Sequence, residues 1–386
     1  MIVSRRHKKL PIKTRVARKI EEIGRHEWDK VFPNVIESYQ FFKTLDECDL
    51  EQFSFYYILA YEKKTLVGVA ACFMMEYSLD TSMKGPLRRI SNAVKKIRPR
   101  IFSIKTLVCG MPLGSGRMGI TGDSDKVFRV MLRRMEQIAK KEKAAIIAFK
   151  DFGHSDTHLL DPLQHEGFAK FDGLPSTELG VWFKDFEEYL KTLSAASRYD
   201  LRRKFRKVDG HVKFDFEIAT ALDDKTLHDV YRMYLDIVDR HEMGFELLPM
   251  EFFRRLPRNM PEETKFFLWR IDGKLAAFVL CFVSGDLLID YYVGMDYSIA
   301  YKYHIYFVKF RDILNWCIRH GIKRYDMGMT GYEPKRRLGF DLVPTYIYAK
   351  LRNRMVRPIF NMFCQFLKFE NFDPDLKYIK EKRGVK

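Results

Sequence analysis

Carboxylates stand where two loops follow predicted strands. Asp296 comes two residues after Gly294, which closes one apolar run, and Asp326 ends the next apolar run of the second half. A carboxylate at the carboxyl-terminal edge of a sheet can orient an ammonium group or remove its proton. Structural roles are the alternative, because Asp296 can cap its loop and Asp326 can pair with Arg324 or Lys335.

Phenols and an imidazole occupy the same loops. Tyr303 and Tyr332 can each donate a phenolic proton, although core packing is the commoner role in a chain with 20 tyrosines. His304 stands at the predicted start of a helix, where the helix dipole lowers the imidazole pKa and keeps the ring neutral. We therefore regard His304 as a candidate base, with an ordinary surface histidine as the alternative.

Two cations and several small residues complete this set. Lys335 and Arg336 are predicted to lie in a loop above a sheet edge, a place poorly suited to core packing and well suited to binding a phosphate or carboxylate. Gly328 and Thr330 precede them, and Gly294 opens the first loop. We predict that all five contribute to cofactor binding.

A glycine-rich loop occurs in the first half. Gly114, Gly116 and Gly119 form a GxGxxG pattern between a predicted strand and a predicted helix. Backbone amides and a helix N-terminus in that context can bind phosphate. Asp123 and Asp125 at the helix start would repel a pyrophosphate, so a flexible glycine turn is the alternative.

The elements that would position the second-half groups form a strand–helix–strand unit. Residues 288–293 are rich in β-branched and aromatic side chains, and apolar residues recur at helical spacing over 305–317. Gly321 is a typical C-terminal helix stop, and residues 322–327 are predicted to return to the sheet. Parallel strands joined by a helix place both loops at one edge of an α/β sheet, where such sheets bind ligands.

The same order of elements occurs twice in the chain. Residues 55–74 resemble residues 265–284: each segment is an aromatic-rich strand, a charged turn and a strand of small residues. Likewise AIIAFKDFGH in the first half is similar to KRYDMGMTGY in the second. The sequence therefore predicts two similar α/β halves.

Composition limits the class of protein. The 386 residues are 47% hydrophobic, enough for two or three packed domains and too many for a disordered chain. Lysine and arginine number 68 against 51 acidic residues, a formal net charge of +17. Such a balance favours anionic partners, namely nucleic acid, phospholipid head groups, phosphorylated cofactors or an acidic carrier protein.

Several classes of chemistry find no support. The six cysteines form no CxxC pair, so we expect reduced core residues of a cytoplasmic protein, with neither disulfides nor a metal site. Neither GxSxG nor HExxH occurs, which argues against a hydrolase or a metalloenzyme. No run approaches ~20 apolar residues and the basic start does not read as a signal peptide, so we expect a soluble or peripheral protein.

Three segments have a basic or amphipathic character. Residues 79–105 interleave cations with apolar residues, which predicts either a segment resting on an anionic surface or a helix packed on its own protein. Residues 198–207 form a cationic cluster. Residues 351–369 predict a strand end and, after Pro358, an aromatic-rich amphipathic helix that either covers the domain or lies on a membrane.

These motifs together resemble a known family. YLKTLSAASRYDLRR lies between the halves, and VGMD is followed by a tyrosine-rich loop and GMTGYEPKRRLGF. The pattern resembles GNAT-superfamily N-acyltransferases of the FemAB-like, peptidoglycan-biosynthesis-like branch, over about residues 28–351. Two family features are missing: a coiled-coil arm in the second half, and a clean (Q/R)xxGx(G/A) cofactor signature at Arg117–Gly119.

The resemblance implies an α/β (α+β) fold of two tandem GNAT-like domains, each a mixed twisted sheet flanked by helices. It implies transfer of an acyl or aminoacyl group to an amine from acyl-CoA, acyl-carrier protein or aminoacyl-tRNA, without a covalent nucleophile or a metal. On this interpretation the donor lies in the second half and the acceptor in the cleft between halves. The alternative function is a non-catalytic GNAT-like module that docks on an anionic membrane or on RNA.

Within this interpretation the catalytic candidates are two carboxylates, two phenols and one imidazole. The phenols would protonate a leaving thiolate or ribose hydroxyl. The candidates are Asp296, Asp326, Tyr303, Tyr332 and His304.

The resemblance and the basic segments also suggest a division of the chain. We expect the protein to be cytoplasmic, with a possible peripheral position at the inner membrane surface. The predicted parts are a basic leader (1–16), an N-terminal GNAT-like domain (17–180) with a basic insertion (79–105), a C-terminal GNAT-like domain (181–351), and an amphipathic helix with a tail (352–386).

Overall fold

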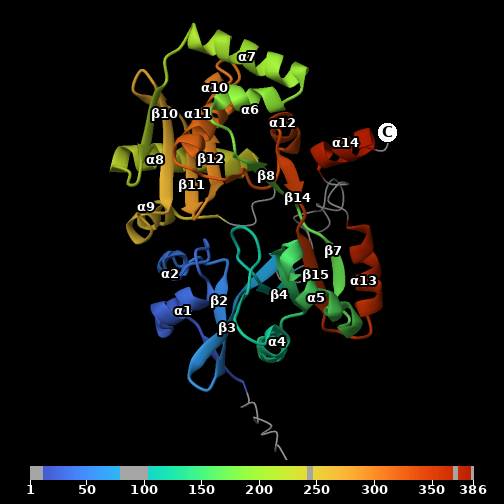
Figure 1. Cartoon of the computed structure of the whole chain (residues 1–386). Helices are drawn as coiled ribbons and strands as arrows, with labels where there is room; N and C mark the ends of the chain where they lie inside the picture. Colours follow the sequence, from blue (N-terminus) through green and yellow to red (C-terminus); the bar gives the residue numbers. More distant parts are fainter. Residues whose placement is uncertain (1–11, 79–102, 241–246, 368–372, 384–386) are drawn as a thin grey trace, which may run out of the picture.

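The computed structural model describes residues 12–78, 103–240, 247–367 and 373–383. Two mixed β-sheets, each flanked by helices, form the two halves of the molecule (Figure 1). Most of the predicted basic insertion, residues 79–102, and most of the predicted leader, residues 1–11, lie outside the described residues.

The first sheet has eight strands in the order β1-β2-β3-β4-β6-β15-β7, with β5 paired to β3. Strands β4 and β6 run parallel and are connected through helix α4, whereas the other pairs are antiparallel. The strands are β1 (Lys13–Ala17), β2 (Ser54–Glu62), β3 (Thr65–Ser78), β4 (Ser103–Cys109), β5 (Gly119–Ile120), β6 (Ile146–Phe152), β7 (Ala169–Asp172) and β15 (Tyr346–Leu351).

The second sheet has seven strands in the order β14-β8-β13-β12-β11-β10-β9. Only β12 and β13 are parallel, and helix α11 connects them. The strands are β8 (Ser176–Gly180), β9 (Asp215–Ala219), β10 (Thr264–Ile271), β11 (Lys274–Ser284), β12 (Leu287–Met295), β13 (Arg324–Asp326) and β14 (Asp341–Val343).

Helices and short 3₁₀ turns connect and cover the sheets. In the first half they are η1 (Ile20–Glu22), α1 (Arg25–Val31), α2 (Tyr39–Glu47), α4 (Ser124–Lys141), η3 (His154–Asp156), α5 (Thr157–Leu160) and η4 (Asp161–Glu166). The remaining helices are α6 (Phe186–Thr192), α7 (Ala195–Asp209), α8 (Asp224–Arg240), α9 (Met250–Asn259), α10 (Tyr297–Ala300), α11 (Ile305–Arg319), α12 (Tyr332–Arg337), α13 (Arg357–Phe366) and α14 (Pro374–Arg383).

The crossover unit predicted for the second half is confirmed. Strand β12, helix α11 and strand β13 follow one another, and β12 and β13 are parallel. Gly321 ends the helix with a φ of +70°, the left-handed conformation that glycine adopts without a Cβ penalty. Ile322 then donates its amide to the carbonyl of Cys317 at 3.0 Å, which closes the last turn.

The two sheets exchange strands. Strand β8 follows the first half in sequence but pairs with β13 and β14 of the second sheet. Strand β15 follows the second half but lies between β6 and β7 of the first sheet, and Figure 1 shows its red ribbon there. Each half therefore contributes one strand to the sheet of the other. The predicted domain boundary after residue 180 stays a prediction, and it does not coincide with the division between the two sheets.

The last residues of the predicted basic leader form a strand rather than a mobile segment. Residues 13–17 form strand β1, which pairs antiparallel with β2 along the edge of the first sheet. Ala17 at the end of this strand is fully buried. Sequence reasoning weighed the basic side chains of this segment and missed an edge strand, a position that tolerates exposed lysine and arginine.

Helix α4 packs on one face of the first sheet. Asp123 caps the helix by accepting the amide of Lys126, and apolar residues at helical spacing turn one side of the helix toward the sheet. A Cβ at Gly68 of β3 would lie 2.3 Å from a methyl carbon of Val127, so glycine is what permits this close approach.

A single hydrophobic core joins the two halves. Helices α1 and α2 on the first sheet pack with helices α8 and α9 and the inner face of the second sheet. At the junction, the rings of Phe282 and Tyr291 lie 4.7 Å apart edge-to-face, and Phe41 contacts both. Aromatic packing of this kind fixes the relative position of the halves, and with it the shape of the cleft between them.

Candidate functional site

A cleft of about 460 Å³ lies between the two halves. Each half supplies several of the loops and strands that line it. Its walls are the loop before α2 (residues 34–37), the glycine loop after β4 (111–117), the turn after β6 (153–156), strand β12 (287–292), the segment after β13 (326–329) and the loop before β15 (343–345).

Strand geometry opens the second-half wall of the cleft. Strands β12 and β13 pair only from Leu287 to Ile289, opposite Arg324 to Asp326. Strand β13 then ends, whereas β12 continues to Met295 with a bulge at Tyr291. The two parallel strands therefore part at Asp326, and its side chain stands at the point of divergence.

Asp326 is held in a fixed orientation. Its Oδ1 accepts hydrogen bonds from Ser176 Oγ at 2.7 Å and from the amide of Gly328 at 2.6 Å. Burial raises the pKa of this carboxyl above its usual range, and these two hydrogen bonds only partly oppose the shift. A rigid carboxylate with a raised pKa is suited to accept a proton from an amine.

The first half contributes two further acids. Glu37 is 4% exposed, and burial raises the pKa of its carboxyl, with Arg117 opposing the shift. Its Oε2 forms a 3.4 Å ion pair with Arg117 Nε but makes no hydrogen bond among the described residues. Burial also raises the pKa of Asp156, which lies close enough to raise that of Glu37 further.

A second layer of charged residues supports the segment after β13. Lys335 is 6% exposed and donates to the carbonyls of Met327, Gly328 and Met329 at 2.6, 3.0 and 3.2 Å. Burial lowers the pKa of its amine to about 8. The three hydrogen bonds hold the segment that carries Gly328 against the cleft.

Behind this segment lies a buried ion pair. Lys309 and Asp290 approach to 3.4 Å, with Lys309 only 1% exposed. Asp290 also accepts the hydroxyl of Tyr325 at 2.9 Å and the thiol of Cys281 at 3.2 Å. The pair ties α11 to β12 and so fixes the strand that forms one wall of the cleft.

Four of the residues predicted from sequence meet in this cleft. Asp326 and Gly328 come from the second half, and Gly114 and Gly116 come from the glycine loop of the first. Gly114 has a φ of +97°, and its Cβ position would lie 3.6 Å from the Tyr291 hydroxyl, which itself donates to the carbonyl of Leu113 at 2.7 Å. The glycine loop thus rests directly on strand β12.

The predicted cations do not lie in an open loop. Residues 332–337 form helix α12, in which Lys335 is buried and Arg336 is exposed with Glu333 3.7 Å away. Tyr332 is fully buried and donates to the carbonyl of Pro175 at 2.9 Å. The expectation of a loop was wrong because the YEPKRR segment has enough helix formers to continue as a turn of helix behind the strand edge.

The remaining predicted loop residues lie apart from the cleft lining. Asp296 caps α10 by accepting the amide of Ser298 at 2.9 Å, which is the structural alternative raised above. His304 begins α11, and burial, followed by the charges of Lys204 and Lys207, lowers its pKa. The direction agrees with expectation, but the causes are burial and the lysines of α7. Tyr303 is half-buried in the same turn.

Three other predicted cofactor residues also lie outside the cleft lining. A Cβ at Gly294 would lie 2.3 Å from the Phe278 ring, and a Cβ at Gly119 would lie 2.6 Å from Val31, so both are sites of close packing. Thr330 is exposed with a φ of +66°. The functional roles of nine residues outside the cleft lining stay predictions: Gly119, Gly294, Asp296, Tyr303, His304, Thr330, Tyr332, Lys335 and Arg336.

Sequence reasoning missed Glu37 and Asp156. The internal repeat held a usable signal for Asp156, because Asp151–Gly153 at the end of β6 corresponds to Asp326–Gly328 at the end of β13, and Asp156 follows that turn. Glu37 lies in an irregular loop without any repeated pattern. Only the packing of α1 and α2 against the second half brings it to the cleft.

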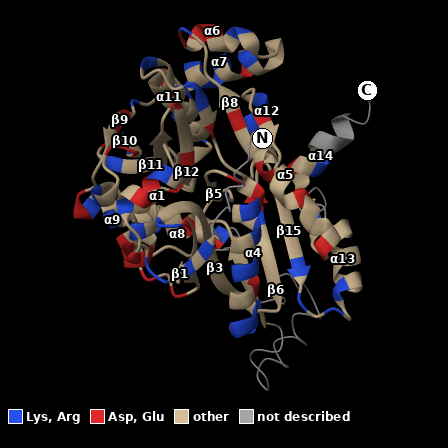
Figure 2. Ribbon diagram, turned by 60° about the horizontal axis from the view of Figure 1, so that its bottom comes forward, with Lys and Arg blue, Asp and Glu red and all other residues tan. Residues whose placement is uncertain are grey.

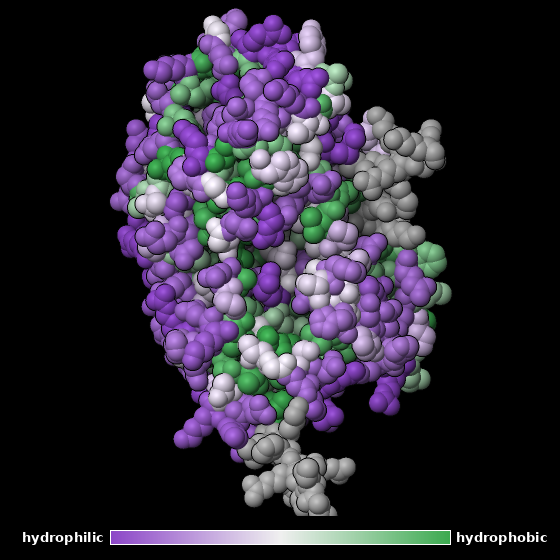
Figure 3. Space-filling view, viewed as in Figure 1, coloured by the Kyte–Doolittle hydropathy of each residue, from purple (hydrophilic) through white to green (hydrophobic). Residues whose placement is uncertain are grey.

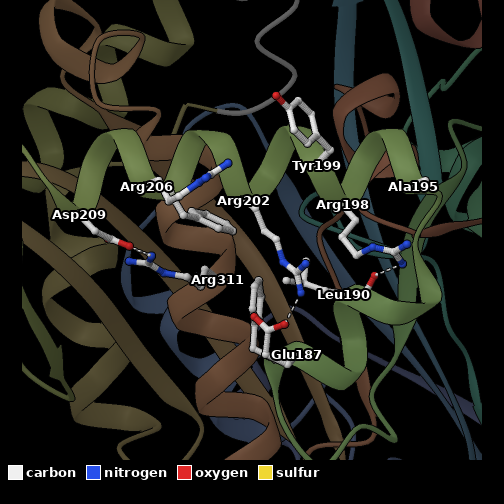
Figure 4. Close-up of a pocket in the computed structure, with 11 residues that line it drawn as sticks. Glu187, Leu190, Ala195, Arg198, Tyr199, Arg202, Arg206, Asp209 and Arg311 are labelled. Atoms are coloured by element: carbon white, nitrogen blue, oxygen red, sulfur yellow. Dashed lines mark hydrogen bonds and ion pairs between the residues drawn. The ribbon is translucent and has the colours of Figure 1, made fainter.

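A second depression, of about 680 Å³, lies on the outer face of α6, α7 and α11 (Figure 4). Its charged side chains are engaged with one another: Arg202 lies against Glu187, and Arg311 pairs with Asp209 at 3.1 Å. Arg198 points toward the carbonyls at the end of α6. This cationic face includes helix α7, which carries the predicted 198–207 cluster, and its acids Glu187 and Asp209 are engaged in ion pairs.

Among the described residues, no group of histidines, cysteines and acids is placed to hold a metal ion. Nor is any described helix both long and apolar enough to cross a bilayer.

Solved structures share this architecture. A crystal structure of FemX superposes with a TM-score of 0.57 at 12% identity, covering 88% of this chain and 98% of that one. L-PGS from Bacillus licheniformis gives 0.51 at 10% identity, covering 85% and 95%. A tandem GNAT protein from the clavulanic acid biosynthesis pathway gives 0.51 at 8% identity, covering 88% and 98%. The fold is thus that of two tandem GNAT-like domains.

Family comparison agrees with the fold. The FemAB-like family, described as peptidoglycan biosynthesis/recognition, matches residues 19–371, and the chain belongs to this family. It is therefore an acyltransferase of the FemAB-like branch, as the sequence motifs indicated. No curated protein matches the chain by sequence.

Proposed function

We propose that the chain transfers an aminoacyl or acyl group to an amine in the cleft between its halves. The observation that carries the proposal is the convergence of Asp326, Glu37 and Asp156 on one cleft, each with a pKa raised by burial. Amide formation from an ester or thioester requires a deprotonated amine held against an activated carbonyl. Acids in a partly buried cleft both attract an ammonium group and accept its proton.

In this proposal Asp326 is the general base. Both hydrogen bonds that orient it go to Oδ1, and Oδ2 is the oxygen that receives a proton from the acceptor ammonium, which leaves a neutral amine as the nucleophile. The amine nitrogen then bonds to the carbonyl carbon of the donor, and the bond to the leaving oxygen or sulfur breaks. The nitrogen loses a second proton as the amide forms, the leaving oxygen or sulfur takes up one proton, and the leaving group departs as a ribose hydroxyl or a thiol.

Glu37 and Asp156 orient the acceptor. The Oε2 atom of Glu37 is buried and lies 3.4 Å from Arg117 Nε without a hydrogen bond among the described residues, so it can still accept one from the ammonium group of a ligand. Arg117 lies beside it with its side chain about half exposed, and both residues line the cleft. An acceptor that carries an ammonium and an anionic group would match this pair.

The donor we propose is an aminoacyl-tRNA, with acyl-CoA or acyl-carrier protein as the alternatives. The net charge of +17 favours a polyanionic donor, and FemX and L-PGS share the fold. The glycine loop offers little to a CoA pyrophosphate, because Gly119 lies in β5, where a Cβ would be 2.6 Å from Val31. We place the protein in the cytoplasm, peripheral to the inner membrane.

Donor binding provides the test. Melting temperatures are measured with charged tRNA, uncharged tRNA, acetyl-CoA and a long-chain acyl-CoA. A true donor at a hundredfold excess over its Kd stabilises the fold by about 2.7 kcal/mol. The proposal predicts a shift with charged tRNA that exceeds the shift with uncharged tRNA. If no donor changes the melting temperature, the non-catalytic binding module becomes the better description.

A further inference from the structure

Helix α13 presents an apolar stripe to solvent. Large hydrophobic side chains on and just before this helix are exposed by 44–89%. Their spacing follows the helical repeat, so they lie along one side of the helix. The stripe consists of Met355, Val356, Ile359, Met362, Phe363 and Phe366.

The opposite side of α13 is anchored to the first half. Cys364 is 1% exposed, and Phe360 packs against the hydrophobic core. Asn361 donates to the carbonyl of Gly167, and Arg357 donates to the carbonyls of Leu351 and Arg352 at 2.7 and 3.2 Å. These contacts therefore hold the helix with its apolar stripe facing solvent.

Half of the exposed large hydrophobic residues of the described chain fall within these 12 positions, 355–366. Apolar side chains scattered singly over a surface need no explanation, but a contiguous exposed stripe marks an interaction site. Figure 3 shows green, apolar surface at the right-hand edge of the lower half, where Figure 1 places α13.

Basic residues adjoin the segment that leads into this helix. Lys140 and Lys143, at the end of α4, line a shallow depression together with Arg352 and Asn353 of the segment that leads into α13. Arg352 binds the two parts together by donating to the carbonyls of Ala139 and Ala144 at 2.9 and 2.7 Å. Figure 2 shows blue ribbon along α4 and in the turn before α13.

We propose that the α13 stripe is a docking surface for an anionic lipid bilayer. An apolar helix face flanked by cations is the arrangement of helices that lie in the membrane interface, with apolar side chains in the acyl boundary and cations at the head groups. Lys140 and Lys143 are exposed beside residues 352–353, just before the stripe begins, and complement the negative charge of such lipids.

Size argues against a second copy as the occupant. Helix α13 has 10 residues, so it is only about 15 Å long. Its stripe covers a few hundred Å² at most, whereas a stable protein interface buries about 800 Å² on each partner. A bilayer has no such requirement, because lateral contacts with lipid supplement the inserted helix face. The proposal that the α13 stripe binds a bilayer is independent of the proposed transfer reaction.

The test is co-sedimentation of the full chain with vesicles of phosphatidylglycerol and phosphatidylethanolamine, compared with vesicles of phosphatidylcholine alone. The variant Ile359→Gln/Phe363→Gln removes two apolar side chains that are 63% and 59% exposed, so the fold should be unaffected. The matched control is Tyr199→Gln, which changes a side chain 65% exposed on α7.

We expect binding to anionic vesicles, a loss of at least about tenfold in the Ile359/Phe363 variant, and no loss in the control. Lys140→Glu/Lys143→Glu should weaken binding to anionic vesicles only. Equal binding by wild type and the Ile359/Phe363 variant would overturn the proposal, as would no vesicle binding at all. A wild-type dimer that this variant dissociates, without vesicle binding, would assign the stripe to self-association instead.

Discussion

Replacing Asp326 by asparagine separates a chemical role from a structural one. An asparagine side chain retains the oxygen that accepts hydrogen bonds from Ser176 Oγ and the Gly328 amide, so the segment after β13 should keep its position. What the variant loses is the ability to take a proton. General base catalysis contributes a factor of about 10²–10⁴, which corresponds to ~2.7–5.5 kcal/mol of barrier.

The same variant should also change how the stability of the fold depends on pH. Burial raises the pKa of Asp326 in the folded protein, so the folded state binds its proton more tightly than the unfolded state. Stability contributed by this group is therefore largest at low pH and falls as pH rises through the folded pKa. The asparagine variant lacks this loss, so the difference in melting temperature between variant and wild type should shift in favour of the variant as pH rises above the carboxyl's unfolded-state pKa of about 4.

The assay follows a labelled aminoacyl group from charged tRNA to amines under single-turnover conditions. We expect the rate for Asp326→Asn to fall at least a hundredfold, with donor affinity unchanged within about twofold. A variant that transfers at the wild-type rate would refute the assignment of the base. So would a variant that loses transfer only because it melts well below wild type at pH 7.

Three further predictions concern stability and can be measured by calorimetry. Lys309→Met leaves Asp290 as an uncompensated buried charge and should lower the free energy of unfolding by ~3–5 kcal/mol. Adding Asp290→Asn should restore part of this loss. A loss under about 1 kcal/mol would contradict a stabilising ion pair. Arg117→Ala leaves Glu37 buried without its cation, so the pKa of Glu37 rises further. The melting temperature of the variant should be below that of wild type at pH 7 and should approach it at pH 4, where Glu37 is protonated. An equal drop in melting temperature at both pH values would contradict this prediction. Gly68→Ala places a Cβ 2.3 Å from a side chain of α4 and should cost ~1–3 kcal/mol, and an unchanged melting temperature would show that α4 moves freely.

Local patterns were enough to predict the crossover unit and the duplication. The β12–α11–β13 order follows from β-branched runs, helical spacing and Gly321, all of which act within a few turns of chain. The strand exchange could not be predicted in this way. Strand β15 pairs with β6 about two hundred residues earlier, and no local pattern records which distant edge a strand completes.

The residues of the candidate site likewise fall into those that local sequence patterns predict and those that they do not. Asp326, Gly328, Gly114 and Gly116 were predictable because each follows a strand at its carboxyl end. Glu37 reaches the cleft only through the packing of helices from both halves. Long-range packing of this kind is not visible in the spacing of residues along the chain.

The most direct test of the cleft as the reaction site is hydrogen–deuterium exchange of the full chain with and without saturating donor. The account predicts slower exchange in residues 113–117 and 326–329, one loop from each half, with the outer face of α7 little changed. Protection confined to α7, with both cleft loops exchanging as in the free protein, would contradict it.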